Sequence, residues 1–572
     1  MRPGTHAAVI GGLAALAMVA TTVVGSGAAG AQAAASKHGG TIVAALPAAT
    51  NVDWYFPETN AANDYTAVAD ILGMMWQPLI YFNNQDQLDP SQELASKITY
   101  NTEGTVYHVF LNPKWHWSNG TPVTAADAVW SMQALLAMMS SKAPTPWPAA
   151  AQGAGGMPQD IQSVTQNGEY EFSITVTSPV NQQWFIANAI GSLGVWPKAQ
   201  WDKYPNNMSE EIGYLGRNAT NPGFDSVVDG PFKLVKAVEN ESWTFVPNPA
   251  YSGHKSTVSQ FIWQYEASDE ADFAGLRTGG IQIGYLPSED WAARLELPDR
   301  MVVAPNLSFN FAWPNMNAGA EDGVNKIFSN LYVRQALEMG MNGSAALSII
   351  YDNQGTPVYG PYPSVPKTEF SDPALNSPVY PYDPAKGLAL LEAHGWHEVD
   401  GVMVNGSQQM KFTLMYPAGS QAITEEYELF QAGWAKEGIQ ITLEPTPVAA
   451  LVGDLGSPAK WELIGIGYVY GGGYPSGESL FYENQGLDLN GWNNPEENHL
   501  IQLTQEPAPS TAIMLQRMFT YFQYTARELP VLFEPSTWSD DEIAPDIGGV
   551  NAYTLDSVTS GMLAQYFYVK GG

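Results

Sequence analysis

Cysteine and histidine, the residues that most often supply nucleophiles and metal ligands, are scarce in this sequence. The chain of 572 residues has no cysteine and eight histidines. A thiol nucleophile, a cysteine-bound zinc ion and an iron–sulfur cluster are therefore excluded. The close pair His394 and His397 spans the end of a predicted helix, where the two rings need not share a face. We expect neither a metal site nor a cofactor.

Two segments resemble catalytic motifs but depart from them at decisive positions. In segment 474–477, Tyr474 stands where the nucleophile pattern G-x-S-x-G requires its first glycine. The glycine-rich run 465–473 lacks the Lys-Ser/Thr pair of a phosphate-binding loop, and Tyr470 replaces the third glycine of G-x-G-x-x-G. No phosphate site is expected.

Carboxylic acids are abundant, with 57 Asp and Glu residues. A glycosidase needs two carboxyl groups at a defined separation in space, which a sequence does not give. No local pattern nominates such a pair. A secreted hydrolase of polysaccharide or peptide therefore remains an alternative, which turnover assays would reveal.

Aromatic residues are the most distinctive chemical feature of the chain. Trp, Tyr and Phe make up 12% of it, and they gather in segments 54–56 and 468–470, whose patterns are not amphipathic. Aromatic walls with a few polar groups suit a cleft that encloses an elongated, partly polar ligand. The alternative is that these rings pack in the core, as most individual tryptophans do.

The charge balance is strongly acidic, because 24 Lys and Arg residues oppose 57 Asp and Glu, for a net charge of -33. Nucleic-acid binding depends on clustered basic residues, so DNA, RNA and anionic membranes are poor partners. Charged residues reach only 14%, against roughly 25% in an average domain. One hypothesis is an acidic habitat, in which exposed carboxylates take up protons near their usual pKa of about 4.

The first 35 residues have the layout of a secretory signal peptide. Arg2 and His6 precede an apolar run over residues 7–24, and the small-residue pattern A-x-A follows at 31–33. An uncleaved membrane anchor is the alternative, since the run approaches the length of a membrane span. The mature chain is expected outside the cell or in the periplasmic space, without a cysteine for a lipid anchor.

The segments that must position a site alternate between strands and helices. Apolar patterns predict strands at 41–46 and 105–111. They also predict hairpins at 161–176, around Asn167-Gly168, and at 232–246, with the turn at 239–241. A helix is expected over 124–138, with Thr124 as its N-cap and Asp127 in its first turn.

The second half of the chain is richer in predicted helices. Asn330 is expected to cap a helix that runs to about residue 341, and Asp383-Pro384 begins another that ends at His394-Gly395. The pattern is α/β or mixed α+β, and the length requires two or more compact units. Segments 301–314 and 529–535 are candidate crossovers between them.

Five segments, in order, resemble the extracellular solute-binding proteins of ABC importers, family 5, which bind peptides, nickel complexes or oligosaccharides. The most recognisable part has the turn W-x-N-G-x-P at 117–122 followed by the helix start T-x-x-D at 124–127. The other segments are MMWQPLIYF at 74–82, the G-P-F hairpin with its N-P-x-Y turn at 229–251, LYVRQALEMGMN at 331–342 and YDPAKGLALLEAHGW at 382–396.

The resemblance implies a two-lobed, periplasmic-binding-protein type II-like fold that encloses its ligand between the lobes. Such a protein is a monomer without enzymatic activity, and it delivers a peptide or similar oligomeric solute to an ABC permease. The expected divisions are a signal peptide over 1–35, lobe I over 36–303 with an inserted subdomain at about 75–222, lobe II over 304–530, and a return segment to lobe I over 531–572.

The sequence departs from peptide-binding members of the family in one place. Those members carry an aspartate in a Trp-x-x-Asp-Tyr-like segment, which pairs with the amino terminus of the peptide. Here the corresponding region is 461–481, where Gly471 or Gly473 stands in place of the acid. An enclosed ammonium group without a counter-charge is costly, so an oligosaccharide, a blocked peptide or another uncharged oligomer becomes an alternative to a free peptide.

The resemblance places aromatic, amide and glycine residues around the ligand. The rings would stack on the solute and donate hydrogen bonds, and the glycines would let the backbone approach closely. The expected binding residues are Trp54, Tyr55, Asn310, Tyr468, Tyr470, Gly471, Gly473 and Tyr474.

Overall fold

The computed structural model describes residues 39–571, except 84–85, 287, 305–306, 470–472, 484 and 556–560. The predicted signal peptide lies outside these residues. All of the described residues belong to one compact unit, which contains three large sheets. We call them by their numbers of strands.

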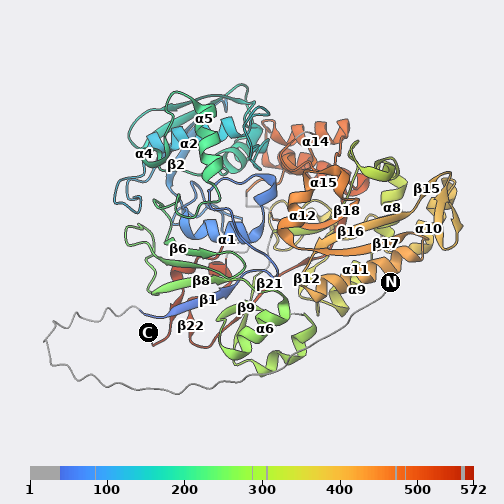
Figure 1. Cartoon of the computed structure of the whole chain (residues 1–572). Coiled ribbons are helices and arrows are strands. Elements are labelled where there is room, and N and C mark those ends of the chain that lie inside the picture. Colours follow the sequence, from blue (N-terminus) through green and yellow to red (C-terminus); the bar gives the residue numbers. More distant parts are fainter. Residues whose placement is uncertain are drawn as a thin grey trace, which may run out of the picture. The chain divides into compact units, whose positions relative to one another are not determined.

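The seven-stranded sheet joins distant parts of the chain. Its strands are β1 (Thr41–Ala45), β6 (Phe232–Val238), β7 (Ser242–Pro247), β8 (Gln260–Gln264), β9 (Ile283–Tyr285), β10 (Arg300–Ala304) and β21 (Ser539–Ile543). Their order is β10-β21-β9-β1-β8-β7-β6. β1 lies parallel to β8, with Thr41 opposite Gln260, whereas β21 is antiparallel to β9 and β10 (Figure 1).

The five-stranded sheet is built from the second half of the chain. Its strands are β11 (Ser308–Pro314), β16 (Lys411–Pro417), β17 (Gln440–Thr446), β18 (Leu463–Val469) and β19 (Leu532–Glu534). Their order is β17-β16-β18-β11-β19. β11 is therefore flanked by β18 and β19, both antiparallel to it.

The four-stranded sheet is entirely antiparallel and is formed by residues 95–176. Its strands, in the order β2-β3-β5-β4, are β2 (Ala95–Tyr100), β3 (Val106–Leu111), β5 (Glu171–Val176) and β4 (Ile161–Gln166). Smaller sheets are formed by β12 (Gly355–Thr356) with β20 (Ser536–Thr537), by β13 (His397–Val399), β14 (Val402–Asn405) and β15 (Gln408–Gln409), and by β22 (Ile547–Gly548) with β23 (Tyr568–Val569).

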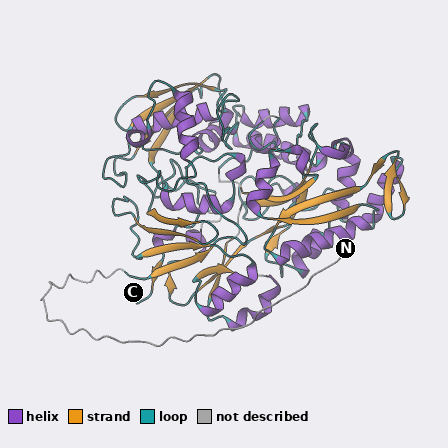
Figure 2. Cartoon of the chain, viewed as in Figure 1, coloured by secondary structure: helices purple, strands orange, loops and turns teal. Residues whose placement is uncertain are grey.

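Helices pack beside each of the large sheets (Figure 2). They are α1 (Thr66–Met75), α2 (Ala125–Met138), α3 (Gln182–Trp184), α4 (Lys198–Trp201), α5 (Met208–Asn218), α6 (Asp269–Thr278), α7 (Val324–Phe328), α8 (Leu331–Gly340), α9 (Gly343–Ile349), α10 (Pro384–Ala393), α11 (Gln421–Ala435), α12 (Val448–Leu455), α13 (Glu478–Phe481), α14 (Pro495–Gln505), α15 (Thr511–Glu528) and α16 (Ala552–Leu555). Among the described residues, no helix combines the length and apolar character needed to cross a bilayer.

The chain passes between the seven-stranded and five-stranded sheets twice. The first passage, between β10 and β11, falls in the predicted segment 301–314. The second lies at 535–538, between β19 and β21, and not at 529–535 as predicted. The difference arises because 532–534 is itself a strand of the five-stranded sheet, a pairing that local sequence does not reveal. The predicted lobe and subdomain boundaries stay predictions.

Most predicted elements are present. The Thr124 side chain and the Asp127 carboxylate form a capping box at the start of α2, and Asp383 accepts a hydrogen bond from the Lys386 amide at the start of α10. Asn330 does precede α8, but its side chain makes no cap: its amide group donates backward, to the carbonyl oxygens of Lys326 and Ile327.

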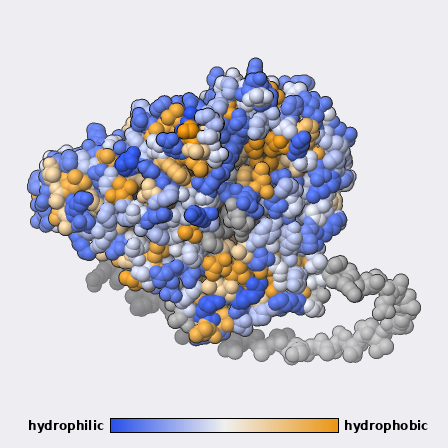
Figure 3. Space-filling view, turned by 180° about the vertical axis from the view of Figure 1, so that it is seen from behind, coloured by the Kyte–Doolittle hydropathy of each residue, from blue (hydrophilic) through white to orange (hydrophobic). Residues whose placement is uncertain are grey.

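The core is rich in large aromatic rings. Among the tryptophans whose exposed fraction is below 2% are Trp115, Trp184, Trp196, Trp201, Trp243, Trp263 and Trp434. Much of the unusual aromatic content is therefore used for packing. On the face seen in Figure 3, hydrophobic patches alternate with hydrophilic residues.

Candidate functional site

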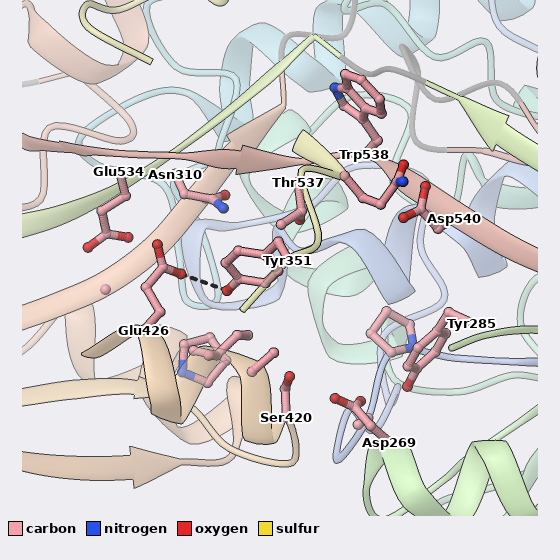
Figure 4. Close-up of a pocket in the computed structure, with 18 of the residues that line it drawn as sticks. Asp269, Tyr285, Asn310, Tyr351, Ser420, Glu426, Glu534, Thr537, Trp538 and Asp540 are labelled. Carbon is pink, nitrogen blue, oxygen red and sulfur yellow. Dashed lines mark hydrogen bonds between the residues drawn. The ribbon is translucent and has the colours of Figure 1, made fainter. Parts of the chain in front are cut away.

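A cavity of about 450 Å³ lies where the seven-stranded and five-stranded sheets face a common space. Residues at or near β1, β9 and β21 form one part of its wall, and residues of β11, β18, β19 and α11 form another. Figure 4 shows polar side chains from both groups directed into it. A solute held here contacts both sheets at once, which is the geometry of a site that encloses its ligand.

The wall of this cavity is acidic. Among the described residues that line it there is no Lys, Arg or His. Its carboxyl groups are those of Asp269, Asp352, Glu426, Glu534, Asp540 and Asp541. In their ionised state these carboxyl groups offer complementary charge to a positively charged solute and repel an anion.

Burial shifts the titration of these acids upward, because a buried carboxylate loses the hydration that stabilises its charge. Burial raises the pKa of Asp269 to about 6 and that of Glu426 to about 7. The pKa values of Asp540 and Asp541 are each raised to about 7, by burial and then by neighbouring carboxylates. The pKa of Glu534 lies well above its usual value, because it is buried and close to Glu426. The cavity wall thus holds several protons near neutral pH.

Two glutamates of the wall are nearly inaccessible to solvent. Glu426 on α11 is 4% exposed and Glu534 on β19 is 3% exposed. The Tyr351 hydroxyl donates a 2.7 Å hydrogen bond to Glu426 Oε2, and the Tyr427 hydroxyl donates one of 3.1 Å to Glu534 Oε2. In Figure 4 the two labelled carboxyl groups lie side by side beside Tyr351. The second oxygen of each, Oε1, is buried and has no donor among the described residues.

A glycine permits this arrangement. Gly465 on β18 lies so close to Tyr427 that a Cβ atom at position 465 would overlap the phenol hydroxyl. The absence of a side chain there lets Tyr427 reach Glu534 across the strand. Asn310 lies on the neighbouring strand β11. Its side-chain amide donates a 3.0 Å hydrogen bond to the carbonyl oxygen of Pro535, the first residue of the second passage between the sheets.

Comparison with known proteins places the chain in a family. A family model described as bacterial extracellular solute-binding proteins, family 5 Middle, matches residues 89–486, which is more than half of the chain. The chain belongs to this family. It is a family of binding proteins and not of enzymes, and its members are extracellular.

Individual relatives of this solute-binding protein are distant in sequence but similar in fold. The oligopeptide-binding protein AppA of Bacillus subtilis is 22% identical over 445 residues, which cover 76% of each chain. The structure of AppA with a nonapeptide has a TM-score of 0.79 at 18% identity and covers 93% of this chain and 99% of that one. NikZ of Campylobacter jejuni, in complex with Ni(L-His), reaches 0.72 at 17% identity, with 92% and 99% covered. The fold is the expected two-lobed, mixed α/β fold of periplasmic binding proteins.

Of the binding residues that the sequence predicted for this solute-binding protein, Asn310 lies at the cavity wall. Trp54 and Tyr55 lie in the core, at 2% and 3% exposure. The Trp54 indole donates to the carbonyl oxygens of Phe56 and Glu58, and the Tyr55 hydroxyl to that of Val52. Their polar atoms are thus committed to the neighbouring backbone.

Tyr468, near the end of β18, and the described residues Gly473 and Tyr474 do not line this cavity. Tyr468 packs against Phe309, with ring centroids 6.0 Å apart. Tyr474 is buried, accepts a 2.9 Å hydrogen bond from Asn181 and donates one of 2.6 Å to the Thr504 carbonyl oxygen. The amide of Gly473 donates to the Asp86 carboxylate. Tyr470 and Gly471 lie outside the described residues.

The acidic wall of the solute-binding protein was missed by sequence reasoning, although one signal was available. Glu534 interrupts the apolar run 529–533, and a carboxylate within a strand of this kind is rarely buried without a purpose. No comparable signal marks Asp269 or Glu426, which come from helices with many other acids. An uncharged solute was an alternative because the family's aspartate is absent from segment 461–481. The carboxyl groups of this wall come from other segments, so the cavity is acidic without that aspartate.

Proposed function

We propose that this solute-binding protein captures a peptide in the acidic cavity and delivers it intact to an ABC importer. One lobe is built on the seven-stranded sheet and the other on the five-stranded sheet, with the cavity between them. The observation that carries the proposal is the composition of the wall, to which both sheets contribute. A ligand that contacts both lobes favours their closed arrangement, and a permease can recognise that arrangement.

Peptide is proposed as the solute class because of the relatives and of the wall chemistry. AppA is named an oligopeptide-binding protein, and its structure contains a nonapeptide. The wall offers carboxyl groups, the Asn310 amide and the glycines Gly465 and Gly467 of β18. Such groups can accept and donate hydrogen bonds along a peptide backbone and complement its positive charges.

Calorimetric titration with a pool of short peptides, and separately with a pool of oligosaccharides, tests this proposal. We expect heat of binding with peptides at one site per chain and none with the sugars. Ala418 lines the cavity, so Ala418→Trp should fill it and abolish binding. Ala449, exposed on α12, provides the matched control Ala449→Trp, which should bind as the unmodified protein does. Binding of sugars alone, or equal binding by both variants, would refute the proposal.

The cellular setting follows from the same proposal. We propose that residues 1–35 are removed on secretion, that the mature chain is a monomer, and that its protein partner is the membrane subunits of the importer. Amino-terminal sequencing of the secreted protein and its hydrodynamic size test the first two statements. A mature chain that begins at Met1, or a stable dimer, would contradict them.

A further inference from the structure

The buried carboxyl pair of Glu426 and Glu534 has more acceptor capacity than its surroundings use. One oxygen of each carboxyl group accepts a tyrosine hydrogen bond. The other oxygen of each, Oε1, is buried and accepts no hydrogen bond from any described residue. Buried polar atoms are normally satisfied, and the desolvation of a carboxylate without a partner is costly. Two such atoms at one place in a cavity wall indicate a ligand group that donates to both.

The charged and titratable neighbours of the pair, within the described part of the chain, are acidic or phenolic. The groups that act on it electrostatically are Tyr351, Tyr427 and Glu338, and Asp269 acts on Tyr351 from the opposite part of the wall. No basic group among the described residues of the wall compensates the pair. The charge of the ionised pair can therefore be compensated by a proton or by a cation that the solute brings.

A metal ion is a poor candidate for that cation. Among the described residues, no group of three or more His, Asp and Glu side chains is arranged to hold one. The hydroxyl groups of Tyr351 and Tyr427 are used as donors to the carboxylates, so they do not face the site as anionic ligands. An organic cation requires only hydrogen-bond acceptors, which the two Oε1 atoms supply.

We propose that Glu426 and Glu534 together bind one ammonium or guanidinium group of the solute, so that the cavity selects peptides carrying positive charge. This inference rests on the proposed function and deepens it. The cation donates hydrogen bonds to the two Oε1 atoms, while Tyr351 and Tyr427 hold the carboxyl groups in place. Its source is either the amino terminus of the peptide or a lysine or arginine side chain.

Binding of a cation by this pair releases protons. Before a solute binds, burial keeps the pKa of Glu426 at about 7 and that of Glu534 well above its usual value. A bound cation stabilises the ionised form of both and lowers these pKa values. Proton release on binding, measured by calorimetry in buffers of different ionisation enthalpy, therefore separates this arrangement from a neutral contact.

Four tetrapeptides on the unmodified protein form the first arm of the test. Each contains three alanines and either lysine or its uncharged analogue norleucine, with the amino terminus free or acetylated. Loss of the charge that occupies the pair should weaken binding by about tenfold to about a hundredfold and abolish the proton release. Sensitivity to norleucine assigns the site to a basic side chain, and sensitivity to acetylation assigns it to the amino terminus.

Glutamine variants form the second arm. Glu534→Gln and Glu426→Gln retain an oxygen for the tyrosine hydrogen bond but remove the charge, so they should bind the charged and uncharged peptides alike. Glu428→Gln, an exposed position on the same helix as Glu426, is the matched control and should behave as the unmodified protein.

The outcomes separate the two proposals. Equal binding of all four peptides by the unmodified protein overturns the inference and leaves the proposed function in place. The same holds if the charge preference survives in both glutamine variants. Binding of none of the peptides overturns the proposed function together with the inference.

Discussion

The indole nitrogen of Trp184 donates a 3.0 Å hydrogen bond to Oε1 of Glu478, a residue 294 positions later in the chain. The same oxygen accepts from the Asn188 amide at 2.6 Å and from the backbone amide of Gly155 at 3.2 Å. Glu478 is only 4% exposed. One carboxyl group thus joins the loop between α2 and β4 and the segment after β5 to the segment that follows β18.

Removing this acceptor should destabilise the protein. Glu478→Ala leaves three donors without their partner in a buried place, and we expect a loss of about 3 kcal/mol in the free energy of unfolding. Glu103, exposed in the turn between β2 and β3, supplies the control variant Glu103→Ala, which should change stability little. Urea denaturation of both variants measures the difference. Equal midpoints for the two variants would show that Glu478 is not a structural acceptor.

Stability should increase as the pH falls from about 8 toward about 4. Burial raises the pKa of Asp229, Asp272 and Glu338 to about 8, and that of Glu437 to about 9. A raised pKa means that the folded protein keeps a proton which the unfolded chain loses at about pH 4. The stabilisation is complete below that pH and is lost as the pH rises through the folded-state values. Thermal midpoints across this range measure the effect.

A single residue offers an internal check on this pH dependence. Asp272 is fully buried, its Oδ2 accepts a 2.9 Å hydrogen bond from the Tyr285 amide, and its other oxygen has no donor among the described residues. Asp272→Asn keeps an acceptor but cannot ionise, so its stability should vary less with pH than that of the unmodified protein. A protein that is most stable at neutral pH, with or without the substitution, would contradict both this account and the hypothesis of an acidic habitat.

Two glycine substitutions of equal size should have opposite effects. Gly465→Ala introduces a Cβ atom against the buried ring of Tyr427, and we expect a cost of about 1–3 kcal/mol together with weaker peptide binding. Gly453 lies in α12, where a methyl group added to its Cα would have no atom of the described residues within 4 Å beyond its own helix backbone and chain neighbours. Gly453→Ala should therefore stabilise the protein by about 0.5–1 kcal/mol. Urea denaturation and calorimetric titration of both variants measure these effects. Stability and binding that are unchanged in Gly465→Ala would mean that Tyr427 is not held by close packing.

Local sequence patterns were sufficient to predict much of the fold. The capping box of Thr124 and Asp127 and the Asp383-Pro384 helix start depend on neighbouring residues alone, and both are confirmed. Asn330 shows the limit of such reasoning, because its side chain could bond to amides of the following helix or to carbonyl groups before it, and it donates to carbonyl oxygens of the preceding helix α7. The strand at 532–534 was missed as a strand because its partner, β11, is more than two hundred residues away.

The cavity was harder to predict than the fold because no contiguous motif encodes it. Asp269, Glu426 and the stretch from Glu534 to Asp540 are three distant parts of the chain that only the assembled sheets bring together. The aromatic clusters attracted attention because large rings serve both binding and packing. In the case of Trp54 the indole N–H donates to neighbouring backbone carbonyl oxygens, and the ring lies in the core.

The central claim is that the protein holds a peptide between its seven-stranded and five-stranded sheets and releases it chemically unchanged. Native mass spectrometry of the mature protein, incubated with a mixture of short peptides and then denatured to release what is bound, measures this directly. We predict complexes of one peptide per chain, with each released peptide at its original mass and basic peptides enriched. Shortened peptides among the products, or an absence of any complex, would contradict the account.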